Sequence, residues 1–175
     1  MRAKVEMRIM CDYCGCRRSG PTAELATEHV RLLELGEMLH DALHDGADAT
    51  TVFTEFVRLL QMHAAKEEIG LFEQARSLKP LADQIEALCQ EHADLHRWLA
   101  DGLTGGHVPD ALRLLATHID DEEYDLFPHI FHALDAEQWD EIELAHRAVE
   151  AVWDDGELAS PAKAATDAAT DSVTS

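Results

Sequence analysis

The sequence predicts an all-α protein: an up-down-up-down four-helix bundle with a short fifth helix and a disordered C-terminal tail. Apolar residues recur at helical spacing along most of the chain, and no segment shows the apolar–polar alternation of a strand. Apolar residues form 46% of the 175-residue chain, which is enough for a buried core. Short loops containing Gly or Pro separate the helical segments, so consecutive helices are expected to be antiparallel neighbours.

Boundary residues support each predicted helix in turn. Gly46 ends the first helix and Pro80 ends the second, because glycine favours a helix C-terminus and proline cannot continue a helix. Glycines and Pro109 form the loop between the third and fourth helices. The fifth helix carries His146 within an apolar face. The predicted ranges, in chain order, are 22–45, 51–79, 81–101, 110–134 and 137–153.

Composition divides the chain into three parts. Residues 1–20 form an irregular, cysteine-containing leader, and residues 21–155 form the bundle domain with its added C-terminal helix. Residues 156–175 are rich in Ala, Thr, Asp and Ser and show no apolar period, which is typical of a disordered tail.

A formal charge of −21 restricts the partners of this protein. Such a surface repels the phosphates of nucleic acids and the surface of anionic membranes. No apolar run reaches the roughly 20 residues of a membrane helix, and residues 1–10 lack the apolar stretch of a secretory signal. We therefore expect a cytoplasmic protein, a monomer or small homo-oligomer, with no nucleic-acid or membrane partner.

Three of the four cysteines lie in the leader. Cys11, Cys14 and Cys16 belong to the run CDYCGC, whereas Cys89 stands alone in the third predicted helix. The leader run is a candidate zinc site or redox pair, but four-coordinate zinc would also need Cys89 or a histidine. The alternative for Cys89 is a place in the core.

Two histidine–glutamate pairs occupy apolar stripes of the predicted helices. Positions i and i+4 of an α-helix lie only about 40° apart, so His63 shares a face with Glu67, and His118 with Glu122. Burial of an imidazole and a carboxylate is unfavourable unless they are paired or bind a metal. These pairs are therefore candidate metal ligands.

Two further histidines are expected at the same level of the bundle. Counted from the shared loops at ~1.5 Å per residue, His29 and His92 lie within about one turn of the two pairs. Four imidazoles and two carboxylates carry a charge of about −2, which suits two Fe(II) ions with a bridging hydroxide and open positions for a small ligand. The candidate ligands are His29, His63, Glu67, His92, His118 and Glu122.

These residues resemble the hemerythrin, or HHE cation-binding, family. The matching segments are Glu28–His29, HAAKEEIGLF at 63–72, QEHADL at 90–95 and HIDDEEYDLFP at 118–128. The resemblance covers about residues 22–134, and the leader CDYCGC is similar to short cysteine leaders in a bacterial subgroup of that family. Four motifs in order on four helices are a specific signal.

The resemblance implies a non-haem di-iron centre that reacts with O2, nitric oxide or peroxide, and it leaves open whether the protein is an enzyme that breaks down peroxide as a catalase does or handles nitric oxide. It assigns the same six residues as ligands. Oxygen-carrying relatives add a fifth histidine, for which His96 is the candidate here, and place the last carboxylate five residues after its histidine, which is Glu123. Helical phase favours Glu122 over Glu123. Whether His96 or Glu123 also binds metal stays open. These departures from the pattern of the oxygen carriers argue against reversible O2 carriage.

Other interpretations compete with this one. A ferritin-like iron oxidase or store would use Glu-x-x-His pairs, and Glu37–His40 and Glu143–His146 have that spacing. A helical interaction module without metal would use the acidic surface alone. Residues expected to face solvent or cap helices are Glu68, Glu123, Tyr124, His40, His44, His107, His129 and His132.

Overall fold

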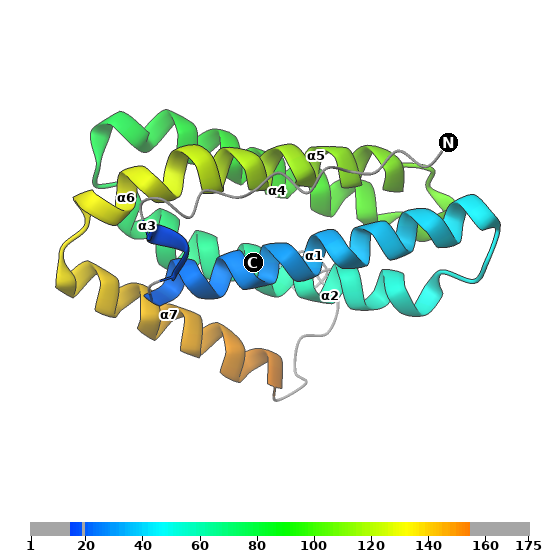
Figure 1. Ribbon diagram of the computed structural model, residues 1–175, viewed down its shortest axis with the longest axis horizontal. Coiled ribbons are helices and arrows are strands. Elements are labelled where there is room, and N and C mark those ends of the chain that lie inside the picture. Colours follow the sequence, from blue (N-terminus) through cyan, green and yellow to red (C-terminus); the bar gives the residue numbers. More distant parts are fainter. Residues whose placement is uncertain (1–14, 19, 155–175) are drawn as a thin grey trace, which may run out of the picture.

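The computed structural model describes residues 15–18 and 20–154, and Figure 1 shows that helices make up this part of the chain. Four long helical rods run alternately up and down, which confirms the predicted bundle. No strand occurs among the described residues. Cys11, Cys14 and the predicted tail at 156–175 lie outside them. The predicted limits of the leader, bundle domain and tail therefore stay predictions.

The helical elements follow one another with few interruptions. They are η1 (Cys16–Arg18), α1 (Gly20–Asp45), α2 (Thr50–Lys66), η2 (Glu67–Leu71), α3 (Phe72–Ala75), η3 (Lys79–Leu81), α4 (Ala82–Ala100), η4 (Gly102–Thr104), α5 (Val108–Asp121), η5 (Glu122–Leu126), α6 (Phe127–Ala133) and α7 (Ala136–Asp154).

The second and fourth rods each contain a π-helical turn, which the sequence reading did not predict. In η2 the backbone N–H of Phe72 donates to the carbonyl of Glu67, and in η5 that of Phe127 donates to Glu122. Such i to i+5 bonds widen the helix by one residue per turn. The second rod also ends at Ala75, earlier than predicted, and a 3-10 turn then carries Pro80.

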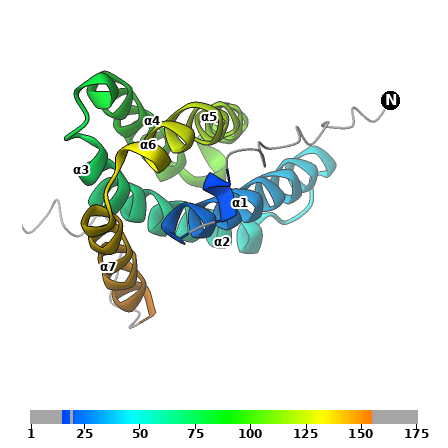
Figure 2. The same ribbon diagram turned by 60° about the vertical axis from the view of Figure 1, so that its left-hand side comes forward.

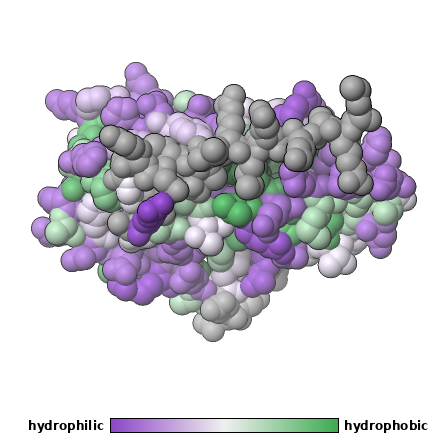
Figure 3. Space-filling view, in the orientation of Figure 1, coloured by the Kyte–Doolittle hydropathy of each residue, from purple (hydrophilic) through white to green (hydrophobic). Residues whose placement is uncertain are grey.

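Two apolar clusters fill the bundle, one on each side of a polar layer. On α1, His29 lies between Leu25 of one cluster and Leu32 of the other. On α4, His92 lies in the same way between Leu88 and Leu95. Most of the surface is hydrophilic in the view of Figure 3. The polar layer is thus enclosed by packed side chains above and below.

The fifth helix, α7, packs outside the four-rod bundle against α1, α2 and η2. Figure 2 shows it inclined to the bundle axis. Of its predicted face, Ile142, His146 and Val149 are buried, and Trp139 is partly buried against the apolar cluster. No helix within 15–18 or 20–154 combines the length and apolarity needed to cross a bilayer.

Candidate metal centre

The bundle brings all six predicted ligands to one place. They form two overlapping groups of four, and within each group the candidate ligand atoms lie within 4.8 Å of one another. Glu67 and Glu122 belong to both groups, whereas each histidine belongs to one. One group adds His29 and His63 to the shared carboxylates, and the other adds His92 and His118.

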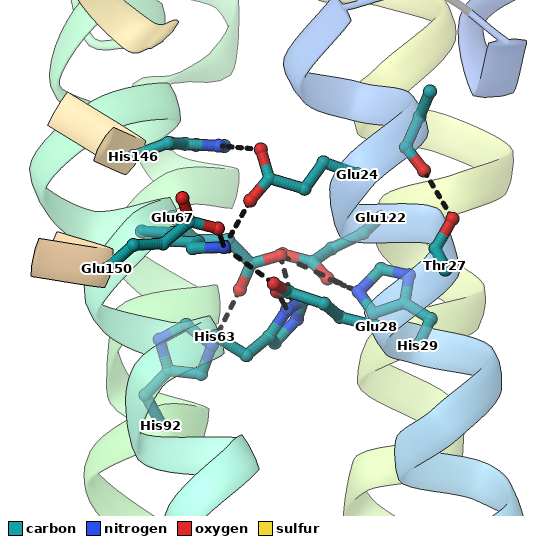
Figure 4. Close-up of polar contacts among 12 residues, drawn as sticks. Glu24, Thr27, Glu28, His29, His63, Glu67, His92, Glu122, His146 and Glu150 are labelled. Carbon is teal, nitrogen blue, oxygen red and sulfur yellow. Dashed lines mark hydrogen bonds and ion pairs between the residues drawn. The ribbon is translucent and has the colours of Figure 1, made fainter. Parts of the chain in front are cut away.

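The carboxylate of Glu67 lies between the two groups. Its Oε1 is 3.1 Å from Nε2 of His63 and 3.6 Å from Nε2 of His29, and its Oε2 is 3.2 Å from Nε2 of His92. Figure 4 shows this carboxylate among the three imidazoles. Each oxygen of Glu67 therefore serves a different group.

Glu122 makes the second link between the groups. Its Oε2 lies 3.2 Å from Nε2 of His29 and 3.4 Å from Nε2 of His118. The side chains of Glu122, His29 and His118 are fully buried. Like Glu67, Glu122 is placed where a carboxylate could bridge two cations.

Several atoms that face the centre have no hydrogen-bond partner among the described residues. They are Nε2 of His29 and His63 and both side-chain oxygens of Glu67 and Glu122. Buried polar atoms are nearly always satisfied in folded proteins, and leaving one unsatisfied costs about 1–3 kcal/mol. A cluster of orphaned nitrogen and oxygen atoms that point at one another indicates a site built for cations.

The other ring nitrogen of every candidate histidine ligand meets a carboxylate. We call these four side chains the outer carboxylates. A carboxylate is an acceptor, so each Nδ1–H donates to it and each Nε2 turns its lone pair to the centre. The Nδ1 to oxygen distances are His29–Glu123 2.8 Å, His63–Glu28 2.9 Å, His92–Glu68 2.9 Å and His118–Glu91 2.7 Å.

The donor set passes a direct test of fit to metal ions. Nε2 of His92 lies 3.0 Å from Nε2 of His118, and both Nδ1 atoms already hold hydrogens toward carboxylates. Two facing lone pairs at this distance repel unless a proton or metal ion lies beside them. Imidazole nitrogen with carboxylate oxygen is a donor set that suits iron among the first-row metals.

Comparison with known families decides the identity of the fold. The hemerythrin HHE cation binding domain family matches residues 20–130, more than half of the chain. The chain belongs to this family. Searches of curated proteins and of solved structures gave no match. The matched region of the hemerythrin domain contains all six candidate ligands and the four outer carboxylates, and it ends before α7 begins at Ala136.

Imidazoles and carboxylates within this hemerythrin site stabilise one another's charged forms. Burial lowers the pKa of His92, but the carboxylates of Glu67 and Glu68 more than offset burial and raise this pKa to about 10. Burial acts in the opposite direction on Glu67, whose neighbouring imidazoles His63 and His29 hold its pKa well below the ordinary value. Without metal, His92 therefore keeps a proton that a cation must displace.

The hemerythrin site repeats one pattern twice. Each half has a Glu–His dipeptide on one helix and a His-x-x-x-Glu-Glu-x-x-x-Phe segment on the next. The first half consists of residues 28–29 and 63–72, and the second of residues 91–92 and 118–127. The phenylalanine of each half stacks on the dipeptide histidine of the other half. Phe127 lies 5.8 Å from His29 with rings 9° from parallel, and Phe72 lies 5.8 Å from His92 at 14°. These rings seal the centre against the apolar cluster beyond.

The expectation that Glu123 faces solvent was wrong. Its side chain is fully buried, and it binds His29 from outside the ligand groups. The expectation assumed a regular α-helix after His118, but the π turn η5 widens the helix at this point. Glu68, its counterpart in η2, remains 44% exposed while it contacts His92.

Other sequence expectations have mixed outcomes. His96 is partly buried but lies in neither ligand group, and burial together with the nearby His92 lowers its pKa. Tyr124 is exposed, as expected. The five histidines expected at the surface are exposed: His40, His44, His107, His129 and His132.

The cysteines that the structure describes do not take part in the centre. Cys16 is buried in an apolar cluster, and Cys89 packs against that cluster while its Sγ accepts from Arg76 at 3.5 Å. No candidate ligand group within residues 15–18 and 20–154 contains a cysteine. Zinc binding by the leader stays a prediction.

Sequence reasoning missed a buried ion cluster beside the site. Lys66 is fully buried and its Nζ contacts Glu24, Glu28 and Glu150. His146 of α7 joins the cluster through Nδ1, which lies 3.1 Å from Glu24. A signal was available, since Lys66 lies one turn after His63 on a stripe that faces the bundle.

Proposed function

We propose that this hemerythrin-family protein holds two iron ions and binds or processes a small oxidant: hydrogen peroxide, nitric oxide or O2. The main support is the pair of overlapping ligand groups that share Glu67 and Glu122. Iron, when bound, supplies one-electron redox chemistry and open coordination positions for a small ligand. The family binds cations. We propose further that the cations are iron and that the shared carboxylates would bridge them.

The residues of this chain have separate roles in the proposal. Nε2 of the four histidines and the carboxylates of Glu67 and Glu122 would hold the ions, and the outer carboxylates hold the Nδ1 hydrogens. Phe72 and Phe127 stack on His92 and His29, and with the apolar clusters they surround the centre with apolar side chains.

Peroxide or nitric oxide chemistry is favoured over reversible O2 carriage. The ligand groups hold four histidines rather than five, because His96 lies outside them. Outer carboxylates such as Glu68, at 44% exposure, bring titratable oxygens from solvent to the imidazoles. Groups of this kind can exchange protons near a reacting ligand, and proton supply favours O–O cleavage over release of intact O2.

Two competing functions find less support. In the ferritin-like alternative Glu143 should face the centre, but it lies on the surface in an ion pair with Arg147. Glu37 and His40 are also exposed. A module without metal would leave the orphaned atoms of Glu67 and Glu122 unexplained.

Metal analysis and rapid mixing test the proposal. Protein reconstituted anaerobically with Fe(II) should bind about two ions per chain, and the oxidised form should absorb in the near ultraviolet. The oxidised protein is then mixed with peroxide or nitric oxide, and the reduced protein with O2. A protein that takes up zinc alone, and never iron, would refute the metal assignment. A long-lived O2 adduct that reverses under vacuum, with no peroxide turnover, would refute only the choice of oxidant.

A further inference from the structure

The two halves of the centre repeat the same types of ligand but differ at the position three residues after His63 and His118. Three residues after its histidine, the first half has Lys66 and the second half has Asp121. Lys66 is fully buried, whereas Asp121 is exposed. The repeat otherwise matches ligand for ligand, so this difference separates two chemically similar metal positions.

Lys66 holds the outer carboxylate of its own half. Its Nζ lies 2.7 Å from Oε1 of Glu28, and Oε2 of the same glutamate lies 2.9 Å from Nδ1 of His63. Glu28 is thus fixed at both oxygens. Glu91, the equivalent carboxylate of the second half, contacts His118 but has Asp121 beside it, and like charges repel.

The outer carboxylates of the two halves also differ in solvent exposure. At the position formed by His29 and His63, the outer carboxylates are Glu123, which is fully buried, and Glu28, which is 11% exposed. At the position formed by His92 and His118, they are Glu68, which is 44% exposed, and Glu91, which is 27% exposed. Water and competing ligands therefore reach the imidazole contacts of the His92 and His118 position more readily.

Helix α7 completes the cluster in the first half. Glu150 of α7 lies 2.8 Å from Nζ of Lys66, and His146 holds Glu24, another partner of that lysine. Figure 4 shows His146 and Glu150 on the same side of the centre as Glu24. This helix lies beyond the family match at 20–130, so an added element of this chain supports one half of the centre.

We propose that Lys66 is a positioning residue that makes the two metal positions unequal. The position at His29 and His63 holds its ion longer, and the position at His92 and His118 exchanges faster. Lys66 acts through Glu28, and α7 acts through Lys66. This inference rests on the proposed two-ion function.

Release of iron to a chelator tests the inference. The full-length protein is loaded with Fe(II) without oxygen and mixed with excess 2,2′-bipyridine, and the coloured complex is followed in time. We expect two phases of about one ion each. Glu28→Gln should accelerate the slow phase, because Glu28 holds His63, and Glu68→Gln should accelerate the fast phase, because Glu68 holds His92. The two variants assign each phase to one position.

Lys66→Met should accelerate only the slow phase, by about 10-fold, the usual effect of removing a side chain that orients a ligand. Glu150→Gln, at a half-exposed site that tolerates substitution, should accelerate the same phase by a smaller factor. Glu143→Gln is the matched control, because Glu143 lies on α7 in a surface ion pair and does not reach Lys66. It should leave both phases unchanged.

The outcomes separate positioning from charge and from folding. Removal of a positive charge near a cation would by itself slow release, so a slower or unchanged phase in Lys66→Met and Glu150→Gln overturns the inference. Equal acceleration of both phases indicates general loosening and also overturns it. A single release phase for two ions refutes the inference alone, whereas uptake of fewer than two ions refutes the proposed function with it.

Discussion

Every candidate histidine ligand is held at Nδ1 by an outer carboxylate. The outer carboxylates fix the tautomer and the ring plane before a metal arrives, so little conformational freedom remains to be lost on binding. Two of them, Glu28 and Glu91, directly precede the dipeptide histidines, and the other two directly follow the shared carboxylates Glu67 and Glu122. Neighbours in sequence therefore act on different histidines in space.

Adjacent glutamates of η5 should respond differently to substitution. Glu122→Ala removes a member of both ligand groups, so we expect metal content to fall below one ion per chain. Glu123→Gln keeps an oxygen that can accept from His29, so both ions should remain, with affinity about 10-fold weaker. Metal analysis and chelator competition measure both effects, with His129→Gln as a surface control. Loss of metal from Glu123→Gln equal to that from Glu122→Ala would show that Glu123 is itself a ligand.

Stability of the metal-free protein should fall as pH rises above neutrality. The pKa of His92 is about 10 in the folded protein, against an ordinary value of 6.5. A raised folded pKa adds stability that is complete below pH 6.5 and is lost as pH rises through about 10. The pKa values of His29 and His63 are raised as well. Burial lowers them, but the neighbouring carboxylates raise them by more.

Urea denaturation of metal-free protein at several pH values between 6.5 and 10 checks this expectation. The free energy of unfolding should decrease across the range, and His92→Gln should reduce the slope. Iron-loaded protein should show a weaker decrease, because metal has already replaced the protons. A free energy of unfolding that increases over the same range would contradict the stated direction.

At the scale of elements, the two π turns begin at Glu67 and Glu122, the two carboxylates that both ligand groups share. A π turn costs helix stability and persists where function requires it. Regular α-helical phase predicted His63 with Glu67 and His118 with Glu122, because these pairs precede the widening. The same phase failed at Glu123, which lies inside it. Hydrophobic period alone did not reveal the π turns, since the extra residue rotates only the short helices that follow them, α3 and α6.

Gly70 in η2 allows α7 to approach the π turn. A Cβ at this position would lie 3.0 Å from Cδ2 of His146 and 3.4 Å from Cβ of Ala145. We therefore expect Gly70→Ala to destabilise the protein by about 1–2 kcal/mol through overpacking. Urea denaturation measures this cost. In the His146→Ala background the cost should shrink, and an equal cost in both backgrounds would exclude the contact with His146 as its cause.

At the scale of the whole molecule, the bundle was predictable because three features indicated the same fold: the apolar period, the loop residues, and the polar residues on otherwise apolar helix faces. His29 and His92 stood where leucines flank them on the same face, and four helices converged on one level. The position of α7 was not predictable from its own pattern. Its apolar face required a partner, but only the folded structure selects η2 and Lys66 as that partner.

Removal of metal should destabilise the whole bundle. A cation that binds only the folded state adds about 4 kcal/mol at a concentration 1,000 times its dissociation constant. For a domain of this size that change corresponds to roughly 10 °C in Tm. Calorimetry of iron-loaded and chelated protein measures it, and re-addition of Fe(II) should restore the higher Tm. Equal Tm values for the two forms would mean that the centre contributes nothing to folding stability.

The twofold pattern of the centre also bears on how the chain assembles. His29, His63 and Glu67 come from the helical hairpin of α1 and α2, and only Glu122 comes from the other hairpin. The second position mirrors this arrangement. Each hairpin thus carries three of the four candidate ligands of one group and supplies a single carboxylate to the other group. An ion held by one hairpin would have an incomplete set of ligands until the other hairpin adds its carboxylate, so metal binding would link the two hairpins.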